Sequence, residues 1–129
     1  MKVLLDTHAL LWFALGDDRL PERARDTIDI TANGVLVSAA SAWEIATKHR
    51  IGKLPEAGPF VPDWQVTLEK LQFEDLPVTA EHALRAGLMT LANRDPFDRM
   101  ILAQALLENA VVVSNEHAWD VTGVQRVWT

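Results

Sequence analysis

The sequence predicts an α/β protein in which a parallel sheet is covered by helices on both faces. Short apolar runs of the kind that form buried strands recur at residues 3–5, 35–38 and 111–113. Helical patterns separate these runs, and strands joined by helices form parallel sheets through right-handed crossovers. A length of 129 residues with 49% hydrophobic residues suits one domain with its own core.

The first half of the chain contains two predicted strands and four predicted helices. Thr7 is a helix-capping residue after the first strand, and Pro21 suits the first turn of the next helix. Three prolines between residues 54 and 62 predict a loop, at the tip of a helical arm or loop of about residues 52–75. The predicted helices are residues 8–15, 22–30, 41–50 and 64–71.

The second half repeats the alternation of strand and helix. Pro77 makes the extended segment 76–78 an edge strand, because proline cannot donate a hydrogen bond within a sheet. Thr79 caps a helix that runs to about residue 91, and Asp95-Pro96 begins a helix that runs to about residue 108. The remaining predicted elements are the strand 111–113, a helical turn at 116–119 and a last strand at 124–128.

The composition excludes several classes of protein and site. The absence of cysteine excludes disulfides, thiolate metal sites and cysteine nucleophiles. No apolar run reaches the roughly 18–20 residues of a membrane span, and Asp6 interrupts the N-terminal apolar stretch too early for a signal peptide. We therefore expect a cytoplasmic protein that makes no use of a membrane. The net charge of −6 has the wrong sign for coating nucleic acid through a basic face, so any RNA contact would depend on local basic residues.

Acidic side chains follow the predicted strands. Asp6 ends the first strand, Glu44 lies about one turn into the helix after the second, and Glu116 follows the strand 111–113. Asp98 lies at the start of a helix that packs on the same sheet. Because the carboxyl ends of parallel strands meet at one edge, we expect these acids to converge there. Converging carboxylates raise each other's pKa, and a hard cation such as Mg²⁺ or Mn²⁺ relieves their repulsion. Such an ion polarises a phosphodiester and activates water.

Each acid also has a simpler interpretation. Asp6 and Asp95 are good helix N-caps. Glu44 precedes Lys48 by four residues, the spacing of a surface ion pair on a helix. Asp98 occupies a first helical turn, where negative charge is favourable. The metal-site prediction therefore depends on several acids meeting at one edge and not on any single residue.

The ordered motifs resemble those of VapC-type toxins of the PIN-domain ribonuclease family, over essentially the whole chain. The segments that carry the resemblance are Leu4–Trp12, Ser38–Ile45, Gly52–Leu54, Asp95–Arg99 with Ala103–Ala105, Val113–Glu116 and Val127-Trp128. The resemblance implies one PIN domain over residues 1–129, with a three-layer α/β/α fold and a parallel sheet of about five strands. It also implies that Asp6, Glu44, Asp98 and Glu116 are catalytic, metal-binding acids. The family usually has Asp at the fourth position, so Asp120 is the alternative to Glu116.

The resemblance implies a metal-dependent endoribonuclease, the toxin of a type II toxin–antitoxin (VapBC) pair. Such a protein hydrolyses RNA with water activated by Mg²⁺ or Mn²⁺. Its implied partners are a cognate antitoxin, an RNA substrate and a second copy of the chain. Glu116 leaves one alternative open, a catalytically weakened PIN-like module that binds RNA or protein. A phosphotransfer domain using Asp6 as nucleophile is disfavoured, because His8 stands where a second acid is expected.

Polar and basic residues beside the acids are candidates for supporting roles. Side chains that could bond to the metal ligands are Thr7, Ser38, Asn115 and Asp95, with capping and turn bonding as the alternatives. Candidate RNA phosphate contacts are Arg99, Lys48 and Arg94, with solvated surface charge as the alternative. We expect Trp12 and Trp43 to lie in the core.

Overall fold

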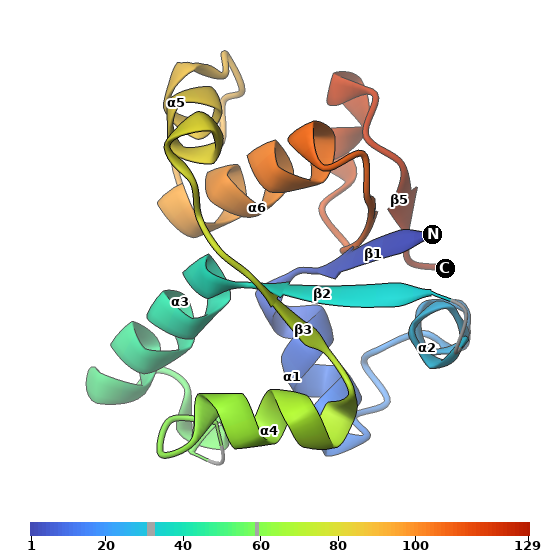
Figure 1. Ribbon diagram of the computed structural model, residues 1–129, viewed down its shortest axis with the longest axis vertical. Coiled ribbons are helices and arrows are strands. Elements are labelled where there is room, and N and C mark those ends of the chain that lie inside the picture. The colour runs from blue at the N-terminus through green and yellow to red at the C-terminus, as the bar shows by residue number, and fades with distance from the viewer. Residues whose placement is uncertain (31–32, 59) are drawn as a thin grey trace.

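The protein contains a parallel sheet of five strands in the order β3-β2-β1-β4-β5. A computed structural model describes residues 1–30, 33–58 and 60–129 (Figure 1). The strands are β1 (Lys2–Leu5), β2 (Gly34–Ser38), β3 (Glu74–Leu76), β4 (Val111–Val113) and β5 (Arg126–Val127). All four neighbouring pairs are parallel. The predicted α/β class with a parallel sheet is confirmed.

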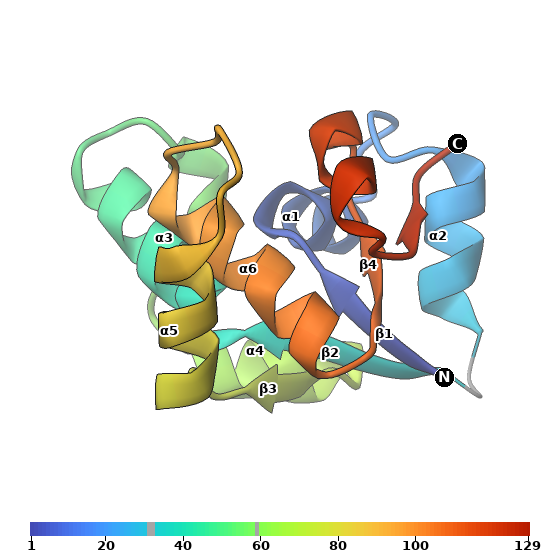
Figure 2. The same cartoon turned by 90° about the horizontal axis from the view of Figure 1, so that it is seen from above.

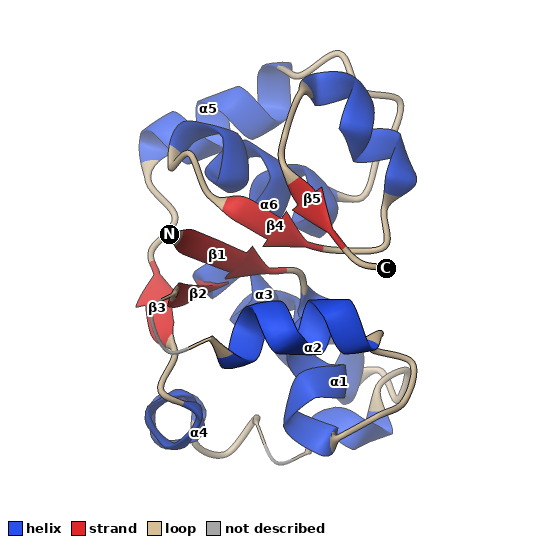
Figure 3. Cartoon of the chain, turned by 90° about the vertical axis from the view of Figure 1, so that its right-hand side faces the viewer, coloured by secondary structure: helices blue, strands red, loops and turns tan. Residues whose placement is uncertain are grey.

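Helices cover both faces of this sheet. They are α1 (Thr7–Leu15), α2 (Glu22–Asp29), α3 (Ala39–Arg50), α4 (Trp64–Leu71), α5 (Ala80–Leu88) and α6 (Pro96–Leu107), with 3-10 turns η1 (Pro55–Ala57) and η2 (His117–Thr122). Figure 3 shows α5 and α6 on one side of the sheet and α1, α2 and α4 on the other. Among the described residues, no helix is long and apolar enough to cross a membrane.

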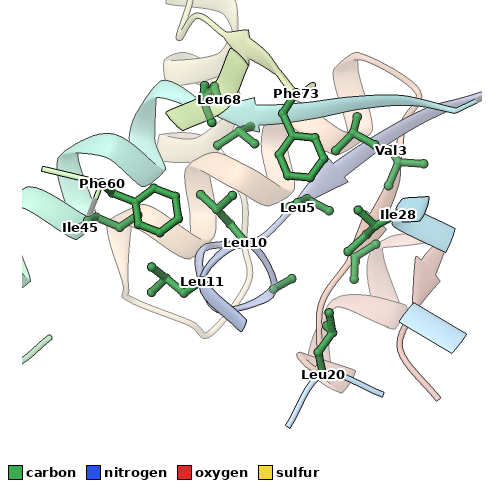
Figure 4. Packing of buried hydrophobic residues seen from close by; sticks show 14 of the residues in the cluster. Val3, Leu5, Leu10, Leu11, Leu20, Ile28, Ile45, Phe60, Leu68 and Phe73 are labelled. Atoms are coloured by element: carbon green, nitrogen blue, oxygen red, sulfur yellow. The ribbon is translucent and has the colours of Figure 1, made fainter. Parts of the chain in front are cut away.

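The alternation of side chains along β1 divides the core into two parts. Val3 and Leu5 pack with residues of α1 to α4, including Leu10, whereas Leu4 packs with Ile101 of α6 on the opposite face. Successive strand residues point to opposite faces, so three consecutive apolar residues supply both layers. Figure 4 shows the first of these clusters, in which Phe60 lies beside Ile45 and Phe73 lies between Leu68 and Val3. Residues 3–5 of the central strand are thus all apolar because they are buried on both faces.

Several element boundaries differ from those predicted. Asp6 is the N-cap of α1, and Thr7 is already helical. The helix α5 ends at Leu88, because the carbonyls that follow bond to Arg99 instead of continuing the helix. The strand β3 ends just before Pro77 and lies at the edge of the sheet. The predicted loop 54–62 contains η1, and its residue 59 lies outside the described residues.

In open α/β sheets, binding sites form outside the carboxyl ends of the strands. The strand β1 leads directly into α1 through Asp6, and β2 leads into α3 through Ser38. Figure 2 shows α1 beginning between α6 and the C-terminal segment. Helix starts from three separate crossovers therefore meet beside the ends of β1, β2 and β4.

Candidate active site

Asp6 is a buried carboxylate at the end of the central strand. Its backbone N–H donates to the Val113 carbonyl at 3.1 Å, and its Oδ1 accepts from the Ala9 N–H at 2.8 Å. Burial raises the pKa of Asp6, while the Ala9 N–H, the Ser114 hydroxyl and the charge of His8 lower it. The negative charge of Glu116 adds to the upward shift. Asp6 is therefore both the helix cap and a buried acid at the sheet edge.

Asp98 lies in the first turn of α6, where it is partly buried. Burial is the main cause that raises the pKa of Asp98 to about 6, and the charges of Asp95, Glu116 and Glu44 raise it further. The Asn93 amide opposes this shift by donating to Asp98 Oδ2 at 3.2 Å. Asp98 is therefore coupled electrostatically to the N-cap of its own helix and to acids from two other segments, α3 and the chain after β4.

Glu44 is 3% exposed and has protein partners on both carboxylate oxygens. Its Oε1 accepts from the Thr7 hydroxyl at 2.5 Å, and Thr7 Oγ1 lies 3.0 Å from Ser41 Oγ. The Lys48 ammonium forms an ion pair with Oε2. The ion pair with Lys48 that the spacing predicts is present, but Glu44 is buried and is not a surface residue. Thr7 and Lys48 thus fix the orientation of the Glu44 carboxylate, and Lys48 balances its charge.

Glu116 and Asp120 differ in what they contact. Glu116 interacts electrostatically with both Asp6 and Asp98. Asp120 is exposed and bonds to Arg126 at 2.8 and 3.0 Å, which lowers its pKa. Arg126 also donates to the Ser114 carbonyl at 2.9 Å, so this ion pair holds η2 against the end of β4. Glu116 is therefore coupled to the other acids, whereas the charge of Asp120 is balanced by Arg126.

The donor chemistry of this edge fits a hard divalent cation. Asp6 and Asp98 are carboxylates with raised pKa values, and within the described residues neither forms an ion pair with a basic side chain. Over the same residues, however, no three histidine or acidic side chains are arranged closely enough to hold one ion. The acids therefore suit a site in which few carboxylates contact the ion and water completes its shell, as Mg²⁺ prefers.

Of the four candidate supporting residues, one bonds to Glu44, two cap helices and one is exposed. Thr7 bonds to Glu44 as described above. Ser38 caps α3 by accepting from the Ala40 N–H at 3.0 Å. Asp95 caps α6 by accepting from the N–H groups of residues 97 and 98 at 2.8 and 3.2 Å. The Asn115 side chain is exposed. For Ser38 and Asp95 the capping interpretation is therefore the correct one.

The three candidate RNA-contacting residues have different environments. The Arg99 guanidinium donates to backbone carbonyls of residues 86, 87, 89, 91 and 93, at distances from 2.5 to 3.5 Å. These bonds hold the segment between α5 and α6 and engage the guanidinium with backbone, while the contact of Arg99 with RNA phosphates stays a prediction. Lys48 is committed to Glu44 but is partly exposed, and Arg94 is exposed in the loop before α6.

Two features of this region were missed from the sequence. Asn93 and Ser41 bond to Asp98 and Thr7, and their only signal was that each lies within five residues of a predicted acid. Trp43 is 63% exposed, so its expected place in the core is wrong. Its ring packs edge-on against Phe97 at 4.7 Å between centroids, beside an apolar pocket that includes Met100. Trp12, the other expected core residue, is partly buried at the margin of the core.

The strand order and the acids at the carboxyl edge define an α/β domain of PIN type. Residues 3–124 match the PIN domain family model, and the chain belongs to that family. Ribonuclease VapC16 of Mycobacterium tuberculosis is 46% identical over 55 residues, a match that covers 35% of this chain and 39% of that protein. The matched part therefore spans well under half of that relative's length.

Three solved structures illustrate the similarity in fold. VapBC2 of Rickettsia felis, bound to a DNA fragment from its promoter, has a TM-score of 0.71 at 15% identity, covering 98% of each chain. VapBC-1 of nontypeable Haemophilus influenzae has a TM-score of 0.69 at 19% identity, covering 98% of this chain and 97% of that one. FitAcB of Neisseria gonorrhoeae has a TM-score of 0.63 at 16% identity, covering 96% and 95%. At these identities the similarity shows the fold alone.

Proposed function

We propose that this chain is a metal-dependent endoribonuclease and the toxin of a type II toxin–antitoxin pair. The proposal depends on one observation at the carboxyl edge of the sheet. The Asp98 carboxylate there interacts electrostatically with Glu116 and Glu44, and Glu116 interacts in the same way with the buried Asp6. Membership of the PIN domain family and the partial match to a protein named as a ribonuclease support the same activity.

Asp6, Asp98 and Glu116 would hold the metal ion, either directly or through water. Mg²⁺ and Mn²⁺ fit this donor set because both prefer carboxylate oxygens and retain several waters. When bound, such an ion supplies an activated water and polarises the phosphodiester. Burial keeps Asp6 and Asp98 in a region of low dielectric, where their attraction for a cation exceeds that of exposed carboxylates.

Glu44 would act by shaping this site from the side of α3. Thr7 and Lys48 occupy its two oxygens and fix its orientation. The Lys48 ammonium also interacts with Asp95 and Asp98, so it reduces the negative charge that an approaching RNA phosphate meets. Because Glu44 is already neutralised, its negative charge contributes less to holding a cation than those of Asp6 and Asp98.

The proposed biological setting follows the family resemblance. The chain would act as one PIN domain in the cytoplasm and associate as a homodimer, and a cognate antitoxin protein would block its site. The structural neighbours solved as VapBC and FitAcB assemblies support a protein partner.

The test is cleavage of a labelled RNA by the purified chain with Mg²⁺ or Mn²⁺, and again with EDTA. We expect cleavage only with metal, and its loss in the folded variants Asp6→Asn and Asp98→Asn. Asp120→Asn is the matched control, because it removes an acid from the same region that is paired with Arg126. Full cleavage by a folded Asp98→Asn chain would contradict the proposal.

A catalytically weakened binding module is the second candidate. The lack of three closely grouped ligands among the described residues favours it, as does glutamate at position 116. Calorimetric titration with Mn²⁺ separates the two functions. Specific binding that Asp6→Asn abolishes supports the nuclease, whereas no binding at millimolar Mn²⁺ supports the binding module.

A further inference from the structure

Aromatic side chains from the two ends of the chain meet beside Asp6. The Trp12 ring lies 5.4 Å from the His8 ring, with their planes at 38°, and 5.9 Å from the Trp128 ring, with their planes at 53°. His8 and Trp12 are one helical turn apart on the outer face of α1, while Trp128 follows β5. We call His8, Trp12, Trp128 and Arg19 the aromatic stack.

Arg19 belongs to the stack because its guanidinium group lies over the Trp12 ring. Its Cζ lies 4.7 Å from the centroid of the Trp12 ring. Asp17 fixes the plane of this group, accepting from Arg19 Nε at 3.1 Å and from Nη2 at 2.7 Å. The carboxylate also balances the charge of Arg19. The role of Arg19 in the stack is therefore to hold the Trp12 ring in place and not to attract phosphate.

His8 is the exposed ring of the stack and the member nearest to the acids in the sequence. It lies in the first turn of α1, two residues after Asp6, and its charge acts on the Asp6 carboxyl. Its side chain is exposed, whereas Trp12 and Trp128 are partly buried. The imidazole ring thus contacts Trp12, is exposed to solvent and lies near Asp6 of the proposed cleavage site.

We propose that His8, supported by Trp12, stacks against a base of single-stranded RNA next to the bond that is cleaved. The inference rests on the proposed ribonuclease function and adds a binding contact to it. Unstacked bases of single-stranded RNA pack on histidine and tryptophan rings, and this attraction does not require a basic surface. A chain with a net charge of −6 needs such a contact, because its overall field repels RNA.

The test measures binding apart from cleavage. A fluorescein-labelled single-stranded oligoribonucleotide is titrated with Asp98→Asn protein in EDTA, and its anisotropy is followed. Adding His8→Ala should weaken binding by about tenfold, within the roughly 5- to 150-fold range that loss of one stacked base produces. Adding His8→Phe should leave the affinity within about twofold, because phenylalanine keeps an aromatic ring and lacks only the two ring nitrogens.

Two further variants test the support behind His8. Trp12→Leu keeps an apolar side chain against the core but removes the ring, and should weaken binding, whereas Trp12→Phe should restore it. The control His49→Ala removes an exposed histidine at the far end of α3 and should leave binding unchanged. Circular dichroism establishes that each variant is folded, and His8→Ala remains decisive if Trp12→Leu does not fold.

An altered RNA identifies the contact from the other side. If the base stacks on His8, an abasic substitution at one position should weaken binding to the Asp98→Asn chain but cause no further loss with His8→Ala. Unchanged binding in His8→Ala overturns the inference, and would be expected if the stack contacts a protein partner instead. Equal losses in His8→Ala and His8→Phe overturn it as well. Failure of the proposed function is a separate result, namely an unaltered chain that binds RNA but does not cleave it with any metal.

Discussion

Thr7 and Glu44 are 37 positions apart in the sequence, and the hydroxyl of Thr7 donates to a carboxylate oxygen of Glu44 at 2.5 Å. This bond joins the first turn of α1 to the middle of α3. It also links Asp6, the residue before Thr7, to the segment that carries Lys48. The bond therefore sets the relative positions of two parts of the site that come from different crossovers.

Thr7→Val should destabilise the protein and reduce cleavage. Valine has a similar shape but cannot donate, so a buried Glu44 oxygen would lose its partner at a cost of about 1–3 kcal/mol. Urea unfolding measures this loss. Thr7→Ser keeps the hydroxyl and should remain close to the unaltered chain. A loss in Thr7→Ser with none in Thr7→Val would mean that the Thr7 methyl group, and not the bond, is responsible.

Lys48→Met should destabilise the protein in a way that depends on Glu44. Removing the ammonium leaves a buried carboxylate without its cation, and because Lys48 is 31% exposed we expect a loss of about 1–2 kcal/mol. Glu44→Gln in the same chain should recover part of this loss, since no buried charge then remains. A double-mutant cycle by thermal unfolding measures the coupling. Additive effects of the two substitutions would contradict the pairing.

Asp98→Asn should stabilise the metal-free protein at neutral pH. The pKa of Asp98 is raised to about 6 in the folded chain, above its ordinary value of 3.8, chiefly by burial. Between these two values the folded state holds more protons than the unfolded state, so stability falls as the pH rises through this range. Asparagine lacks this titration.

Thermal unfolding in EDTA checks the sign of this effect. Relative to the unaltered chain, Asp98→Asn should gain in melting temperature on going from pH 4 to pH 7.5. A bound cation offsets the same charge, so Mg²⁺ or Mn²⁺ should raise the melting temperature of the unaltered chain more than that of the variant. If the difference in melting temperature between the two chains is the same across this pH range, the pKa of Asp98 is not raised by folding.

Arg99→Lys should destabilise the segment between α5 and α6. The guanidinium bonds to five backbone carbonyls there, and a lysine ammonium cannot reproduce that planar set of donors. We expect a loss of about 2 kcal/mol or more in urea unfolding, with faster hydrogen exchange in residues 86–93. Arg94→Lys, in the same loop, is the control and should change neither quantity. A stable Arg99→Lys chain with weaker RNA binding would instead restore the phosphate-contact role.

The elements of the fold were largely predictable because each has a local cause. The apolar run at residues 3–5, the capping threonine at position 79 and the Asp95-Pro96 helix start each appear in the structure close to where the pattern indicates. Strands separated by helices also implied a parallel sheet. The end of α5 was not predictable, because it depends on Arg99, whose bonds to that segment span up to 13 positions.

The sequence by itself determined which acidic residues lie at one edge of the sheet. Acids follow the ends of strands, and parallel strands end at the same edge, so Asp6 and Glu116 were expected at that edge. Only the tertiary structure decided what those charges contact. The hydrogen bond to Glu44 depends on the position of Thr7. The bonds of Arg99 to backbone carbonyls depend on where α5 lies, and the exposure of Trp43 depends on which elements pack against α3. Such contacts join residues far apart in the chain, and short-range patterns in the sequence carry no record of them.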